Sequence, residues 1–239
     1  MYNKESKPKK FRNFYGRLKG KGLRELQQKL LNDQLEKLSI PAVKYEINPD
    51  RKLIELSDLF KNVTSFSLEI GFGGGEHLVY QAERNPNIGF IGCEPYINGV
   101  AMLAGKLSKT ELTNVRIHPG DVRDLFDVLP DDSIDSVYLL YPDPWPKKRH
   151  HRRRFVTSEY LIDLQRVMKT GALLKLATDI PDYVRQSLQE VCKHHFSWTA
   201  TDAQDWRECW SDWMPTRYER KALREGRRPY YLTFEKRES

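Results

Sequence analysis

Short apolar segments alternate along this chain with amphipathic ones. Each apolar segment has the length of a buried strand, and the segments between them repeat apolar residues with the spacing of a helix. The alternation occurs at least five times and predicts a parallel sheet with helices on both faces. The predicted strands are 65–73, 87–95, 114–121, 136–144 and 171–179, and the helices that follow them are 76–83, 97–107, 125–129, 158–168 and 181–195.

Two further strands are predicted near the end of the chain, at 198–202 and 230–236. The fold class is therefore α/β, with a mostly parallel sheet of seven strands. No segment of the sequence repeats another.

The first part of the chain lacks this alternation. Residues 1–40 are predicted to form a basic N-terminal arm, separate from the α/β domain at 41–239. A helical pattern runs through four leucines between residues 23 and 31, and about the first ten residues are expected to be disordered.

Polar residues recur where the predicted parallel strands end. A glycine-rich loop follows Glu69 in the first strand, and acids close the next four, namely Glu94, Asp121, Asp143 and Asp179. Ligands of open α/β sheets bind at the carboxyl ends of the strands. The sequence therefore predicts a ligand site along this edge.

The glycine loop EIGFGGG, residues 69–75, favours a ligand without phosphates. Gly71 and Gly73 allow positive φ and close approach of a ligand. A dinucleotide fingerprint, G-x-G-x-x-G counted from Gly71, would require glycine where Glu76 stands, and Glu76 would repel a pyrophosphate. S-adenosylmethionine carries a sulfonium and an ammonium group but no phosphate, and it suits this loop.

Two of the acids suit the nucleoside part of such a ligand. Glu94 can accept hydrogen bonds from both ribose hydroxyls, although NAD enzymes place an acid here too. Asp121 can accept from an adenine amino group, while the backbone N–H of Val122 serves a ring nitrogen. Each acid has a structural alternative, as the cap of a following helix.

Asp143 is the leading candidate for a catalytic residue. It stands between Pro142 and Pro144, which restrict the backbone on both sides, and beside Trp145. A carboxylate held in this way can accept hydrogen bonds from a flipped base while the indole packs beside it. The alternative is an ordinary turn after a strand, with Trp145 in the core.

The charge of the chain favours nucleic acid or an anionic membrane surface as its partner. The 239 residues carry a net charge of +7, yet residues 1–30 hold ten Lys or Arg against two Glu. A second cationic run, Lys147–Arg154, follows Asp143 directly, and a third spans Arg217–Arg228. Each run has the alternative of a solvated surface, but the position beside Asp143 favours phosphate binding.

The remaining sequence features exclude several classes of protein. The three cysteines have no CxxC spacing, so neither a disulfide framework nor a metal site is predicted. No signal peptide or membrane-spanning run is present, which favours a reducing, cytoplasmic setting.

Together these segments resemble the bacterial tRNA (guanine-N7)-methyltransferases. The resemblance covers most of residues 40–239 and departs from the family at Pro146, where members often carry His. It is carried by EIGFGGG with Glu69, the acids Glu94 and Asp121, DPWPKKRHHRRR at 143–154, ATD at 177–179 and PTRYE at 215–219.

The resemblance implies a Rossmann-like class I methyltransferase fold and methylation of a guanine in the tRNA variable loop, position 46. Glu69, Glu94, Asp121 and Asp143 would contact S-adenosylmethionine, and Asp143 would also be catalytic. Neither a metal nor an obligate protein partner is expected, and the chain would act as a monomer or homodimer. The residues implied to contact tRNA are Lys147, Arg149, His150, His151, Arg152, Arg153, Arg154, Asp179, Thr216, Arg217, Tyr218 and Glu219.

Three alternatives remain open at the level of sequence. A nicotinamide-dependent dehydrogenase conflicts with the missing third glycine. A non-catalytic RNA-binding module explains the cations but not the acids at the strand ends. A methyltransferase acting on another base or atom is compatible with Asp143, and the choice of N7 depends on the resemblance.

Overall fold

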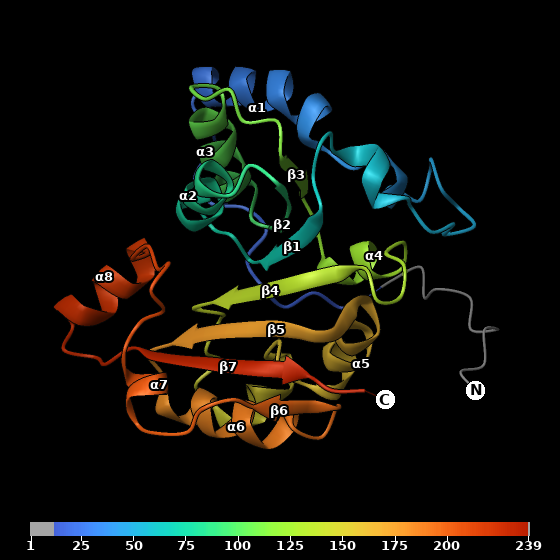
Figure 1. The fold of residues 1–239 in the computed structure, drawn as a ribbon. Helices are drawn as coiled ribbons and strands as arrows, with labels where there is room; N and C mark the ends of the chain where they lie inside the picture. The colour runs from blue at the N-terminus through green and yellow to red at the C-terminus, as the bar shows by residue number, and fades with distance from the viewer. Residues whose placement is uncertain (1–11, 239) are drawn as a thin grey trace.

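The computed structural model describes residues 12–238 (Figure 1). The expected disorder of the first ten residues lies outside this range. The α-helices are α1 (Glu25–Leu38), α2 (Glu76–Arg84), α3 (Ile97–Leu107), α4 (Val122–Phe126), α5 (Ser158–Val167), α6 (Pro181–Val191), α7 (Gln204–Arg207) and α8 (Arg217–Arg224). The strands are β1 (Ser65–Ile70), β2 (Ile88–Cys93), β3 (Val115–His118), β4 (Ile134–Leu140), β5 (Met168–Thr178), β6 (Phe196–Trp198) and β7 (Tyr230–Lys236), and short 3-10 helices occupy Pro41–Val43, Leu56–Leu59 and Lys148–Arg153.

The seven strands form one sheet in the order β3-β2-β1-β4-β5-β7-β6. The five strands from β3 to β5 are mutually parallel, whereas β7 pairs antiparallel with both β5 and β6. The predicted seven-stranded, mostly parallel α/β fold is confirmed. Chain order reverses between β1 and β4, so the carboxyl ends of these two strands flank the switch point at which such sheets bind ligands.

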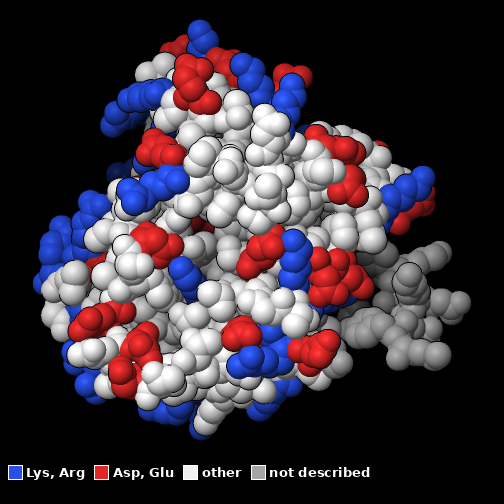
Figure 2. All heavy atoms as spheres, viewed as in Figure 1, with Lys and Arg blue, Asp and Glu red and all other residues white. Residues whose placement is uncertain are grey.

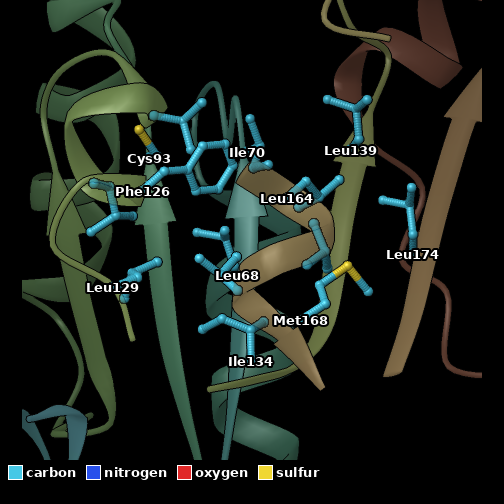
Figure 3. Packing of buried hydrophobic residues seen from close by; sticks show 14 of the residues in the cluster. Leu68, Ile70, Cys93, Phe126, Leu129, Ile134, Leu139, Leu164, Met168 and Leu174 are labelled. Atoms are coloured by element: carbon cyan, nitrogen blue, oxygen red, sulfur yellow. The ribbon is translucent and has the colours of Figure 1, made fainter. Parts of the chain in front are cut away.

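Both faces of the sheet are covered by helices. Helices α1, α2 and α3 contribute Leu31, Leu78 and Leu103 to one core, which covers β2 and β3. The larger core lies on the opposite face, where α4, α5 and α6 pack on the central strands (Figure 3). Successive residues of β1 point to opposite faces, so Leu68 and Ile70 enter the larger core while Glu69 points toward α2.

Some predicted boundaries differ from the structure for local reasons. Helix α4 begins at Val122, three residues before the predicted start, because the Asp121 carboxylate caps it by accepting from the Arg123 backbone N–H at 2.9 Å. The sixth strand was predicted to start at residue 198, but in the structure β6 already ends at Trp198. Helix α8 was not predicted, since of its eight residues only Glu219 and Ala222 are buried and the apolar period is weak.

The described part of the N-terminal arm packs on the rest of the chain. Helix α1 lies against α3, with Leu31 and Leu38 buried. Before it, the backbone N–H of Ile97 donates to the Leu18 carbonyl at 3.1 Å, and Asn98 bonds the backbone of Gly20 at 2.8 Å. The division of the chain at residue 40 stays a prediction.

No helix within residues 12–238 combines the length and apolar character needed to cross a membrane.

The contact between α3 and the glycine loop should tolerate no side chain. A Cβ at Gly99 would lie 2.3 Å from the Gly73 carbonyl oxygen, whereas a Cβ at Gly105 in the same helix has no neighbour within 4 Å. We expect Gly99→Ala to lower the free energy of unfolding by about 1–3 kcal/mol through overpacking. Gly105→Ala is the matched control and should raise it by about 0.5–1 kcal/mol. Urea denaturation measures both, and a neutral Gly99→Ala would contradict the packing.

Candidate active site

A cavity of about 550 Å³ opens at the carboxyl ends of β1 and β4. It brings together six of the predicted cofactor residues. These residues follow four different strands, and the parallel sheet places the ends of those strands side by side. The six residues are Gly71, Gly73, Glu94, Asp121, Val122 and Asp143. Small-molecule sites commonly measure about 300–1,000 Å³, so the volume suits one nucleoside-sized ligand.

The glycine loop and Glu94 form one wall of this cavity. Gly71 and Gly73 adopt φ of 75° and 56°, the left-handed conformation that glycine permits. This turns the Gly73 backbone N–H toward Glu94 Oε2, at 2.6 Å, while the Tyr96 N–H donates to Oε1 at 2.8 Å. Burial raises the pKa of Glu94 despite these two bonds. Each oxygen keeps a free lone pair for a ligand hydroxyl.

Asp121, which follows β3, also lines the cavity and already has protein partners. In addition to capping α4, its carboxylate accepts from the Arg123 guanidinium, at 2.5 Å to Oδ2. The structural role weighed for this acid in the sequence is therefore present. Asp121 still lines the cavity, so a ligand can reach it as well.

Asp143 projects from a loop whose backbone is unusually constrained. The residues on either side of the Pro-Asp-Pro segment, Tyr141 and Trp145, adopt φ of 50° and 39°. Non-glycine residues in this region cost roughly 1–3 kcal/mol each and persist only where surrounding contacts impose them. Two prolines therefore restrict the loop, and its surroundings hold Tyr141 and Trp145 in the left-handed conformation.

The Asp143 carboxylate itself forms no hydrogen bond or ion pair with any residue of the range 12–238. It is exposed toward the cavity, and partial burial by the walls raises its pKa. Acids whose pKa is raised by their surroundings and that face a cavity are candidates for functional groups.

Arg154 holds the Asp143 loop in place, and its position contradicts the prediction that it contacts tRNA. Its side chain is fully buried, donates to the Pro144 carbonyl at 2.7 Å and to Gln186 at 2.8 Å, and pairs with Asp182 at 2.9 Å. Burial and full engagement exclude it from contact with a phosphate. Arg154 anchors the Asp143 loop to α6 instead of binding RNA.

The other cations of this run, apart from Arg153, remain at the surface. Lys147, Lys148, Arg149 and Arg152 are exposed, while His150 and His151 are partly so. Arg153 turns inward to line the cavity, with its guanidinium 4.9 Å from the ring centres of both Trp145 and Tyr15.

Helix α8 supplies the other rim. Arg217 and Tyr218 line the cavity, and Arg220, Lys221 and Arg224 are exposed. Lys and Arg side chains gather along the side of the molecule where Figure 1 draws α8 (Figure 2). Cationic surface therefore borders the cavity on two sides.

Four predicted site residues are engaged within the protein. Glu69 is buried and bonds His77 Nδ1 at 2.8 Å, behind the glycine loop. Glu219 is buried between Trp213 Nε1, at 2.7 Å, and the Tyr231 hydroxyl, at 2.6 Å. Thr216 caps α8 by accepting from the Glu219 N–H at 3.2 Å, and Asp179 pairs with Arg227. None of the four lines the large cavity, so direct ligand contact by them stays a prediction without geometric support.

Several lining residues were missed in the sequence. The arm contributes Phe14, Tyr15 and Arg17 to the cavity, and Tyr160 of α5 joins them. Aromatic and cationic residues alternate in this part of the arm, a pattern that suits phosphate binding but does not by itself place the arm beside a cavity. No group of three acidic, His or Cys side chains in the described range could hold a metal ion.

Comparison with known proteins identifies close relatives. The model of a family described as "Putative methyltransferase" matches residues 64–232. A tRNA (guanine-N(7)-)-methyltransferase of Roseobacter denitrificans is 60% identical over 232 residues, which cover 97% of this chain and 98% of that protein. The protein of the same name from Agrobacterium fabrum is 47% identical, with coverage of 94% and 95%.

Solved structures share the fold at much lower identity. The structure titled "Structure of an Antibiotic Related Methyltransferase" superposes with a TM-score of 0.56 at 18% identity, covering 79% of this chain and 98% of its own. A 16S rRNA (adenine(1408)-N(1))-methyltransferase from Catenulisporales acidiphilia gives 0.55 at 14% identity, with coverage of 74% and 88%. These two likenesses concern the fold alone.

The unpaired carboxylate should cost stability. Because the pKa of Asp143 is raised in the folded chain, ionisation opposes folding above that pKa, and the cost is absent below the unfolded pKa of about 3.9. We expect Asp143→Asn to raise the free energy of unfolding at pH 7, and the difference to vanish toward pH 3–4. Denaturation across pH measures it.

Asp205 provides a control of opposite sign. Backbone N–H groups of Thr201 and Asp202 lower the pKa of its carboxyl, which therefore stabilises the fold above the unfolded pKa. Asp205→Asn should lower stability at pH 7 and lose its effect in acid. A destabilised Asp143→Asn at pH 7 would instead mean that this carboxylate has a partner in the protein.

Proposed function

This chain belongs to the family of tRNA (guanine-N(7)-)-methyltransferases, and we propose that it transfers a methyl group from S-adenosylmethionine to N7 of a guanine in tRNA. The target is the guanine of the variable loop. The observation that carries the proposal is the free Asp143 carboxylate facing a nucleoside-sized cavity whose two rims are cationic.

The residues of the cavity fit the proposed methyl donor. Glu94, oriented by two backbone N–H groups, retains acceptors for the ribose hydroxyls. Asp121 and the backbone of Val122 line the cavity and would recognise an adenine edge, and the positive φ of Gly73 lets the ligand approach the loop closely. Glu94 and Asp143 supply negative charge toward a cationic ligand.

The chemistry requires little proton transfer. S-adenosylmethionine supplies a methyl group on a positively charged sulfur, which is left as a neutral thioether. Guanine N7 carries a free lone pair, so no base has to remove a proton before the new C–N bond forms. Asp143 orients the base and favours the movement of positive charge onto its ring, and the fixed loop keeps this carboxylate in line.

Binding of tRNA is assigned to the exposed cations. Lys147, Arg149 and Arg152 follow the Asp143 loop, while Arg220 and Arg224 extend from α8 on the other rim. Phosphates held on both sides would direct one flipped guanine into the cavity. Thr216 and Glu219 contribute by fixing α8, which places Arg217 and Tyr218 at the entrance.

The proposal extends to the setting in which the protein works. We propose a cytoplasmic setting, which a tRNA substrate and three cysteines without disulfide spacing support, and a chain that acts as a monomer or homodimer without an obligate protein partner.

A direct assay tests the reaction and its target atom together. The protein is incubated with labelled S-adenosylmethionine and tRNA, and the product is cleaved chemically at N7-methylguanine. Cleavage at the variable-loop guanine is expected, and a tRNA with adenine at that position should accept no label. Label without cleavage at a guanine would favour methylation of another atom.

Loss of the free carboxylate should separate catalysis from binding. We expect Asp143→Asn to lower kcat by about 100-fold or more, because charge stabilisation in the transition state is lost. The Kd for tRNA should change less than about threefold, since the phosphate-binding cations are all retained. Asp58→Asn, an exposed acid at the opposite edge of the sheet, is the control. Near wild-type turnover in Asp143→Asn would refute its catalytic role.

Removing two exposed arginines should weaken the salt dependence of tRNA binding. In Arg149→Gln combined with Arg152→Gln, the slope of log Kd against log salt should decrease by about 0.7–0.9 for each phosphate that the protein no longer neutralises. Lys193→Gln combined with Arg237→Gln removes the same charge at the far edge of the sheet and should leave the slope unchanged. Equal slopes in both double variants would place the first pair away from the RNA.

A further inference from the structure

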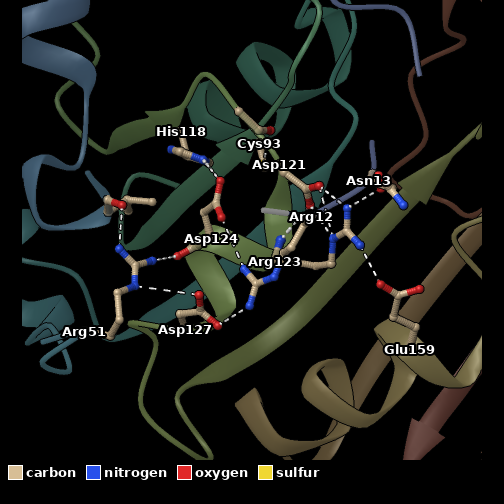
Figure 4. Close-up of polar contacts among 12 residues, drawn as sticks. Arg12, Asn13, Arg51, Cys93, His118, Asp121, Arg123, Asp124, Asp127 and Glu159 are labelled. Atoms are coloured by element: carbon tan, nitrogen blue, oxygen red, sulfur yellow. Dashed lines mark hydrogen bonds and ion pairs between the residues drawn. The ribbon is translucent and has the colours of Figure 1, made fainter. Parts of the chain in front are cut away.

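Arg123 is a buried arginine that joins the cavity wall to the N-terminal arm. It lies in α4, one residue beyond Val122, and its side chain is 5% exposed. Its guanidinium donates to three separate segments of the chain: the Asp121 carboxylate, the backbone carbonyl of Asn13 at 2.9 Å, and Glu159 of α5 at 2.5 Å (Figure 4). The function proposed above uses none of these bonds.

The bonds to Asp121 fix the orientation of that carboxylate. Arg123 Nε lies 3.1 Å from both oxygens, Nη2 lies 2.5 Å from Oδ2, and the backbone N–H lies 2.9 Å from Oδ1. The pair also neutralises the negative charge of Asp121. An oriented, neutralised carboxylate suits the uncharged amino group of an adenine better than a cationic centre.

The same guanidinium fastens the arm where it passes the cavity. Asn13 immediately precedes Phe14 and Tyr15, which line the cavity. Arg12 forms a second attachment to α4, at 2.7 Å to Asp127 and 3.2 Å to Asp124. Beyond the cavity, Leu18 and Gly20 bond to the start of α3. The segment across the cavity is therefore fixed at both ends, and Arg123 lies at one of them.

Because one planar group makes both attachments, they are geometrically linked. Several donors in a rigid fork let arginine bind a carboxylate and a carbonyl together, which lysine cannot reproduce. Tyr160, whose ring centre lies 5.0 Å from the guanidinium, also lines the cavity. A shift of Arg123 would therefore disturb the acid, the arm and an aromatic wall at once.

Resting on the proposed function, in which this cavity takes S-adenosylmethionine, we propose that Arg123 is a positioning residue that couples cofactor binding to docking of the N-terminal arm. It aligns Asp121 for the adenine ring and holds residues 13–17 across the same cavity. Cofactor and arm then stabilise one another through a single side chain.

The first test measures cofactor affinity by calorimetry on the full-length protein. In Arg123→Gln and in Arg123→Lys, the Kd for S-adenosylmethionine should increase about tenfold. This is the effect expected from the loss of one charge-assisted hydrogen bond. At saturating cofactor, kcat should stay within about twofold of the wild type, because no group near the transferred methyl has changed. Arg166→Gln is the matched control, since Arg166 bonds Phe126 and Leu129 carbonyls away from the cavity.

The second test follows the arm. Arg17 and Lys19 are exposed and offer trypsin sites at the end of the segment across the cavity and just beyond it. S-adenosylmethionine should slow cleavage there in the wild type but not in the Arg123 variants. Arg12→Gln loosens the arm without touching Asp121, and it too should weaken cofactor binding. Combined with Arg123→Gln, its effect should be smaller than the product of the two single effects.

Unchanged cofactor affinity in both Arg123 variants, or equal protection of the arm in wild type and variants, would overturn the coupling. If Arg123 served only to stabilise the fold, the variants would have a lower free energy of unfolding, but the Kd for S-adenosylmethionine would not rise relative to kcat. Failure of the wild-type chain to bind S-adenosylmethionine is a different result. It would refute the proposed function itself, and this inference with it.

Discussion

Parallel pairing between β1 and β4 is the constraint on which the site depends. These strands are neighbours in the sheet although two other strands separate them along the chain. Their carboxyl ends therefore lie side by side, with the glycine loop leaving one and the Asp143 loop leaving the other. The helices on the two faces bury the strands and keep this alignment. A cavity at the junction follows from the topology, because connections on either side diverge to opposite faces.

The acids around the site differ mainly in whether neighbouring groups of the protein satisfy them. Glu69, Asp179 and Glu219 are bonded to neighbouring side chains, and they hold the walls together. Glu94 is oriented by backbone N–H groups but keeps acceptors free. Asp143 lines the cavity and has no hydrogen-bond or ion-pair partner among the residues that the structure describes. Its carboxylate is therefore available to pair with a cationic ligand, or with the positive charge that develops on the base during methyl transfer.

The cations divide in the same way. Arg154 and Arg123 are buried, and each ties a site loop or acid to a more distant element. Lys147, Arg149 and Arg152 remain exposed and are free to meet a polyanion. Adjacent residues of one basic run thus serve opposite purposes, since 3-10 turns send successive side chains in different directions.

The sequence by itself determined most of the elements, and it identified the acids and the glycine loop of the site. Apolar segments of strand length, alternating with helical periods, were sufficient for the seven-stranded α/β fold because these patterns reflect local burial. The acids and the glycine loop could be placed at one edge, since parallel strands share the direction of their ends. Tertiary structure alone decided which side chains were satisfied. Partners such as Asp182 for Arg154 or Asn13 for Arg123 come from distant parts of the chain, and charge compensation depends on distances that no local pattern contains.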